Sequence, residues 1–113
     1  MKIDIDNTYF RVLSNTKDGE VQADTVFHYH QNDNLIWGEY SGGGIVKGQI
    51  LGKVINNEYL EFNYQHINTS FEFMTGTCKS YPMEPMDGKR IFKEHWKWTC
   101  RDYSEGESEI IEV

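Results

Sequence analysis

Hydrophobic and polar residues alternate along most of the chain with a period of two. Short runs rich in Val, Ile, Thr, Tyr, Phe and Trp are separated by turns that contain Gly, Asn or Asp, which is typical of strands joined by hairpins. No segment keeps a period of 3.6 residues over three helical turns, so we expect almost no helix. The pattern predicts eight strands, at residues 8–14, 21–31, 34–41, 44–55, 59–67, 70–79, 90–100 and 107–113.

These strands indicate the fold class. Consecutive antiparallel strands with one buried face close most simply into a barrel, because closure removes the unpaired edges that promote aggregation. We therefore predict an all-β fold: an eight-stranded antiparallel up-and-down (meander) barrel, formed by residues 1–113 as a single domain. A β-sandwich of two sheets is the alternative. The interior of such a barrel is either filled by side chains or holds one small ligand.

Hairpin geometry predicts which side chains share the interior, because the loop length fixes the register of the two strands. We expect two-residue turns at 33–34, 42–43 and 68–69. This register places His28 opposite Glu39 and Tyr64 opposite Phe73, and it assigns both pairs to the inner face. Ten residues of that face are candidates for ligand binding: His28, His30, Trp37, Glu39, Tyr64, His66, Phe73, Glu94, Trp96 and Trp98.

The predicted interior mixes imidazoles and carboxylates with aromatic rings. A buried carboxylate must be paired, hydrogen-bonded, protonated or open to water. One interpretation is a pocket for a small, partly apolar molecule, for which Gly48 and Gly52 leave room. A second is a small enzyme that uses Glu39 or Glu94 as a general acid or base. A third is a structural or oligomerising module whose polar groups satisfy one another. The sequence leaves open whether the protein is an enzyme.

His28 and His30 share one face of a strand and are candidate metal ligands. Imidazole and carboxylate ligands suit zinc or iron. Cupin barrels follow such a histidine pair with a glutamate after three or four residues, whereas Glu39 comes nine residues after His30. We therefore predict no metal and no cofactor.

The opposite face is predicted to be polar, apart from a few apolar side chains. These could form a homodimer contact, and they are Phe27, Tyr29, Ile36 and Tyr40. The longest connection, SYPMEPMDGK at 80–89, contains Met83 and Met86. It is either a lid over one mouth of the barrel or an ordinary crossover.

Charge and targeting signals restrict the partners. The chain has 18 acidic and 11 basic residues, a net charge of −7, and no Lys/Arg cluster, so nucleic acid and anionic membranes are poor partners. The first residues lack the pattern of a signal peptide, and no window reaches the length of a membrane span; we expect a cytoplasmic protein. Cys78 and Cys100 lack the spacing of a disulfide framework or zinc ribbon, and we predict buried or half-buried free thiols.

Several segments together carry a family resemblance: FHYHQ, IWGEYSGGGIVKG, YQHIN, TGTCKS, EHWKWT and SEGES. The chain resembles small bacterial proteins of about this length that often carry the label N-acetylglutamate synthase. Acetyltransferase folds hold the acetyl-CoA pyrophosphate on a Gly-rich loop at a helix N-terminus; the pattern predicts neither, so no catalytic residue is carried over. The predicted architecture is similar to that of avidins and lipocalins, whose barrels bind small molecules, although the lipocalin GxW is absent.

Overall fold

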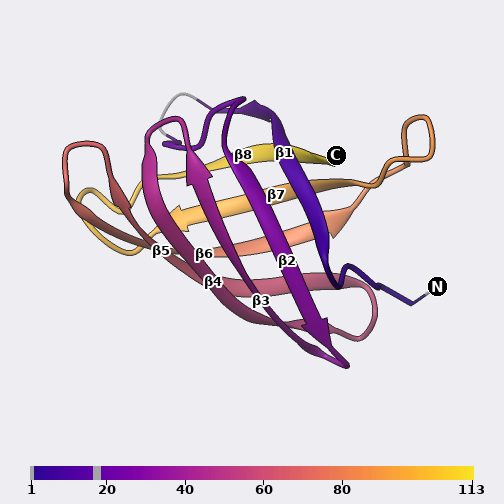
Figure 1. Ribbon diagram of the computed structural model, residues 1–113. Helices are drawn as coiled ribbons and strands as arrows, with labels where there is room; N and C mark the ends of the chain where they lie inside the picture. Colours follow the sequence, from indigo (N-terminus) through magenta and orange to yellow (C-terminus); the bar gives the residue numbers. More distant parts are fainter. Residues whose placement is uncertain (1, 17–18) are drawn as a thin grey trace.

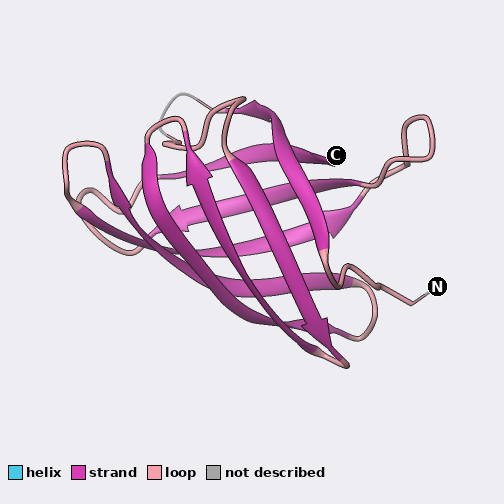
Figure 2. Cartoon of the chain, in the orientation of Figure 1, coloured by secondary structure: helices cyan, strands magenta, loops and turns pink. Residues whose placement is uncertain are grey.

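The computed structural model describes residues 2–16 and 19–113. Its eight strands each pair antiparallel with the next, and β8 pairs with β1 to close a barrel (Figure 1). No described residue is helical (Figure 2), which confirms the predicted all-β up-and-down barrel. The strands are β1 (Thr8–Asn15), β2 (Val26–Asn32), β3 (Leu35–Gly42), β4 (Ile45–Ile55), β5 (Tyr59–Asn68), β6 (Phe73–Pro82), β7 (Ile91–Trp98) and β8 (Glu105–Glu112).

The strands form because their side chains alternate between a buried inner and an exposed outer face. In β6 the alternation is regular from Met74 to Ser80, with every second residue buried. The turns are made by residues that tolerate a left-handed backbone, such as Asp33 in the β2–β3 hairpin and Gly43 in the β3–β4 hairpin, with φ of 54° and 62°. Among the residues described, no helix has the length and hydropathy that crossing a membrane requires.

One end of the barrel is plugged by apolar side chains. This plugged end carries the N-terminal segment and the connections after β2, β4 and β6. Phe10 packs edge-on against both Tyr29 and Phe92, with ring centroids 5.6 Å apart in each pair. Ile5, from the segment before β1, is fully buried and belongs to the same core. The opposite end, which we call the open end, carries the connections after β1, β3, β5 and β7.

A β-bulge at the open end reverses the predicted faces of β2 and β3. The β3–β4 turn occupies residues 43–44, and beyond it Tyr40 pairs with Gly48. Val46 and Lys47 are both exposed, so one residue of β4 is extra to the alternation. A bulge adds one residue to one strand only, and the expected pairing across this hairpin is therefore wrong by an odd number of residues.

The bulge reverses eight predicted interior or exterior assignments at once. The pairing of His28 with Glu39 and of His30 with Trp37 is as predicted, but these four residues face outward, not into the interior. The four residues expected on the outside as a homodimer contact are instead buried core: Phe27, Tyr29, Ile36 and Tyr40. That contact is therefore wrong.

The β5–β6 connection produces a second reversal. It is longer than the expected two-residue turn, with Phe71 at φ 62°, and Tyr64 pairs with Gly76 instead of Phe73. An odd change in loop length exchanges the two faces of the following strand. Phe73 consequently points outward and is 60% exposed, which corrects its assignment to the pocket.

Two further expectations about the interior are corrected. The connection between β6 and β7, residues 83–90, projects from the plugged end (Figure 1), far from the open end, and the lid hypothesis for it is wrong. Gly48 and Gly52 do not leave room for a guest. A Cβ at Gly48 would overlap the ring of Tyr40, and one at Gly52 would overlap the main chain of the adjacent strand at Phe62.

Candidate functional site

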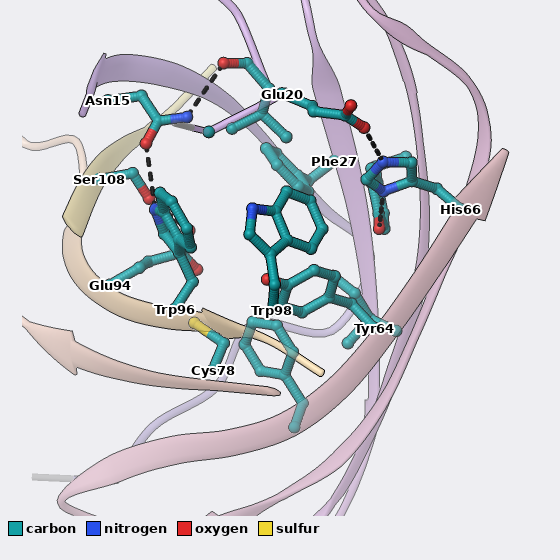
Figure 3. A pocket seen from close by; sticks show the side chains of 15 residues that line it. Asn15, Glu20, Phe27, Tyr64, His66, Cys78, Glu94, Trp96, Trp98 and Ser108 are labelled. Atoms are coloured by element: carbon teal, nitrogen blue, oxygen red, sulfur yellow. Dashed lines mark hydrogen bonds and ion pairs between the residues drawn. The ribbon is translucent and has the colours of Figure 1, made fainter. Parts of the chain in front are cut away.

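A small cavity lies inside the barrel toward the open end (Figure 3). Its volume is about 50 Å³, and Glu20 and Val21, from the β1–β2 connection, line it together with strand residues. A site of this size has space for a few water molecules. Its walls are largely aromatic, from Phe27, Tyr40, Phe62, Tyr64, Trp96 and Trp98. The cavity is therefore mainly apolar, and its few polar groups decide its chemistry.

The first polar group is a chain of three side chains across the mouth. Glu20 Oε1 lies 2.7 Å from His66 Nε2, and His66 Nδ1 lies 2.8 Å from the Tyr40 hydroxyl (Figure 3). Since a carboxylate only accepts, His66 Nε2–H donates to Glu20, and Tyr40 O–H donates to Nδ1. Burial lowers the pKa of His66, against the opposing effect of Glu20. The imidazole is thus held neutral in one tautomer.

Glu20 is bound through both carboxylate oxygens. Its Oε2 accepts a hydrogen bond of 3.1 Å from Asn68 Nδ2, whose amide also donates to Glu72 Oε1. The hydrogen bonds of Glu20 therefore join the loop between β1 and β2 to the end of β5, across the mouth of the barrel. We call the Glu20 side chain, with its hydrogen bonds to His66 and Asn68, the latch.

Asn15 holds the same connection to β7. Trp96 Nε1–H donates to Asn15 Oδ1 at 3.1 Å, and Asn15 Nδ2 donates to the carbonyl of Val21 at 3.1 Å (Figure 3). The indole N–H is satisfied by an asparagine that in turn positions the cavity wall. Trp96 packs against Trp98 with ring centroids 5.7 Å apart.

Glu94 lies deeper in the barrel and is buried. Ser108 Oγ donates to its Oε1 at 3.2 Å, and burial raises the pKa of Glu94 to about 7, the serine hydrogen bond acting in the opposite direction. Among the described side chains, Glu94 Oε2, Ser80 Oγ and the Tyr29 hydroxyl are buried without a hydrogen-bond partner, although Ser80, which pairs with Glu94 across β6 and β7, lowers the pKa of Glu94 as Ser108 does. Such atoms are rare in native interiors, so a carboxyl group with incompletely satisfied oxygens lies inside an apolar space.

Cys78 also lines the cavity, but its thiol has low reactivity. It is a free thiol, as is the half-buried Cys100, which confirms the predicted state of both cysteines. Burial raises the pKa of Cys78 well above its usual value, so the reactive thiolate is suppressed. Cys78 lies opposite Trp96 on β7.

The structure divides the ten predicted site residues into two groups. Five lie inside the barrel and line the cavity: Tyr64, His66, Glu94, Trp96 and Trp98. The other five lie on the outer wall, namely His28, His30, Trp37, Glu39 and Phe73. The hypothesis of Glu39 as an acid or base within the pocket is therefore wrong.

Sequence reasoning missed three residues of the mouth. Glu20 and Asn15 lie in or beside an irregular connection, where no periodicity assigns a face. Tyr40 could have been found, because one face of the β2–β3 hairpin carries Phe27, Tyr29, Ile36 and Tyr40, whereas the other carries two histidines and a glutamate. The more apolar face is the one that a core requires.

Comparison with known proteins identifies the family. The family model described as avidin-like protein matches residues 3–113, a segment that includes all eight strands and the residues that line the cavity. Comparison with curated proteins found no match, and comparison with solved structures found none either. The chain belongs to the family of avidin-like proteins.

Proposed function

We propose that this avidin-like barrel binds a small, uncharged and partly apolar molecule in its interior, at the open end. The observation that supports this most is the cavity at the open end, in which aromatic walls surround a few convergent polar groups. Ligand sites are typically of this kind, with apolar linings and a small number of polar atoms that orient the guest.

The polar groups restrict the chemistry of the ligand. The described lining contains no lysine or arginine, so an anionic guest would meet no countercharge and would face Glu20 and Glu94. A neutral guest with a ring or branched aliphatic body suits Phe62, Tyr64 and the tryptophans. Its polar atom would reach the buried carboxyl of Glu94, which lies between Ser80 and Ser108.

Entry of such a guest requires the mouth to widen. Pockets that enclose organic ligands span roughly 300–1,000 Å³, several times the 50 Å³ of this cavity. The strands are fixed by the closed ladder, whereas Glu20 and Val21 are held by side-chain bonds to His66, Asn68 and Asn15. These bonds would open to admit the ligand, and the latch would then move outward.

A thermal-shift and tryptophan-fluorescence screen against neutral metabolites tests the proposal, using Phe62→Trp and Phe73→Trp as matched variants. Phe62 lines the cavity, while Phe73 is on the adjacent strand with its ring outside. A ligand bound inside should lose about tenfold or more in affinity with Phe62→Trp, since overfilling a packed site costs roughly 1–3 kcal/mol. Phe73→Trp should bind as the parent does.

Two results would overturn the proposal. One is a screen in which no neutral compound gives saturable binding to the folded protein. The other is a ligand whose affinity is the same in both variants, which would place it outside the barrel. If Phe62→Trp does not fold, Ser108→Val, which fills the floor beside Glu94, replaces it.

One observation favours a second candidate function. A carboxyl group with a pKa of about 7 in an apolar site is suited to general acid–base catalysis at neutral pH. If the barrel is an enzyme, Glu94 is its acid or base. Glu94→Gln should then abolish turnover of the ligand while leaving its affinity within a few-fold of the parent; unchanged turnover would reject this function.

A further inference from the structure

The two histidines that sequence reasoning placed in the pocket form a cluster on the outer wall instead. His28 and His30 project from β2, and Glu39 projects from β3 directly opposite His28. All three are partly or largely exposed. The cluster is therefore reachable from solvent and independent of the cavity.

The three side chains converge closely. His30 Nε2 lies 3.0 Å from Glu39 Oε1, and the two imidazole rings have centroids 4.3 Å apart. One ligand atom from each residue lies within 4.8 Å of those of the other two. Zinc binds histidine nitrogen and carboxylate oxygen at about 2.0–2.2 Å, so ligand atoms of a tetrahedral site lie about 3.3 Å apart. Small side-chain rotations would bring the three groups to that separation.

Neighbouring side chains hold the imidazoles in place. The ring of His28 stacks on Tyr9, with centroids 4.1 Å apart and an interplanar angle of 13°. Its Nε2 bonds to Asn7 Oδ1 at 2.9 Å, so Nε2 carries the proton and Nδ1 keeps a lone pair. The ring of His30 stacks on Trp37. Metal-binding histidines characteristically give their second nitrogen to such an acceptor, which orients the ring.

We propose that His28, His30 and Glu39 form a binding site for a divalent transition metal, best matched by Zn²⁺, on the outer wall of β2 and β3. Two imidazoles and one carboxylate are a ligand set that zinc uses when its fourth position is left to water or an exogenous group. The net charge of −7 favours a cation at the surface. The spacing of these residues differs from the cupin pattern, but the hairpin sets Glu39 directly opposite His28, as its register predicts.

The test is isothermal titration of the tag-free protein with ZnCl₂, with His95→Ala as the matched control. His95 is an exposed outer-face histidine that also pairs with a glutamate, its Nδ1 lying 3.3 Å from Glu107 Oε2. We expect one zinc per chain with an affinity in the micromolar range. His28→Ala, His30→Ala and Glu39→Gln should each weaken binding about tenfold or more, a loss in the range seen when metal-site interactions are removed, while His95→Ala should not.

The site is rejected if zinc does not bind saturably, or if the cluster variants and His95→Ala bind it equally. Circular dichroism checks that each variant is folded; Glu39→Gln keeps the shape of an exposed side chain, so it decides the matter should a histidine variant misfold. The interior variant Phe62→Trp should leave zinc affinity unchanged. The proposals of a metal site and of a ligand cavity are therefore tested independently, and the failure of one does not reject the other.

Discussion

Glu20 Oε1 lies 2.7 Å from His66 Nε2, although the two residues are 46 positions apart in the chain. The side chain of His66 is 1% exposed, whereas that of Glu20 is 29% exposed. A buried donor is thus satisfied by a partner that reaches in from the rim of the barrel. Because the partner comes from a connection and not from a strand, the bond joins the β1–β2 connection to the strand ladder at β5.

Removing the latch should destabilise the protein in a graded way. Glu20→Ala leaves the buried His66 Nε2–H without its acceptor, at a cost of about 1–3 kcal/mol in the free energy of unfolding. Glu20→Gln keeps an oxygen that accepts from Nε2–H and should cost less. Urea denaturation measures both.

Glu84→Ala is the control, because Glu84 lies in the exposed β6–β7 connection and such changes usually stay within about 0.5 kcal/mol. If Glu20→Ala were as stable as Glu84→Ala, the latch would contribute nothing to the folded state.

The buried carboxyl of Glu94 should make stability depend on pH. Its pKa rises from an ordinary 4.5 to about 7 on folding, so the folded state binds more protons than the unfolded state between these values. The contribution of Glu94 is therefore fully present below about pH 4.5 and is lost as pH rises through 7. Glu94→Gln has no such loss.

The difference in unfolding free energy, variant minus parent, should accordingly increase by roughly 3 kcal/mol from pH 4.5 to pH 7 and then level off. Both proteins keep His66, whose pKa is lowered and whose contribution has the opposite sign, so it cancels in the difference. Urea denaturation at a series of pH values measures the effect. A difference that does not vary with pH would mean that Glu94 ionises normally inside the barrel.

The strands were predictable from the sequence, but the inward faces of three of them, β2, β3 and β6, were not. Period-two alternation and turn residues locate each strand, because both are local properties, although the strands expected at 21–31 and 70–79 begin only at Val26 and Phe73. The face of a strand depends on every residue counted since the last known position. One bulge at Val46 and one longer connection before Phe73 each changed that count by an odd number, and neither has a strong local signal.

The site was predictable only where those errors did not act. His66, Glu94 and Trp96 lie on strands whose phase was correct, and they line the cavity. Glu20 lies in a connection, just before the strand expected at 21–31, and its role depends on a contact with β5 that only the closed barrel creates. Residues of this kind have no periodicity by which they can be recognised.

Gly48 should be intolerant of any side chain. The ring of Tyr40 covers it, and the Tyr40 hydroxyl is fixed by its hydrogen bond to His66. Gly48→Ala should therefore cost about 1–3 kcal/mol, as overpacking of a core typically does. A double-mutant cycle identifies the cause, because the same change made in a Tyr40→Leu background should cost clearly less. Equal costs in the two backgrounds would show that the ring is not responsible.

The two cysteines should differ in their reaction with a thiol reagent such as DTNB. Cys78 is 4% exposed and lines the cavity, and its raised pKa keeps it as the unreactive thiol. Cys100 is half-buried near the open end, where its Sγ lies 3.4 Å from the Thr75 amide nitrogen. The folded protein should release one equivalent of thionitrobenzoate and the urea-unfolded protein two.

Cys100→Ser should abolish the reaction of the folded protein, whereas Cys78→Ser should leave it unchanged. Rapid modification of Cys78 in folded Cys100→Ser would instead mean that the mouth opens on the time scale of the reaction, and a ligand bound in the cavity should then protect that thiol.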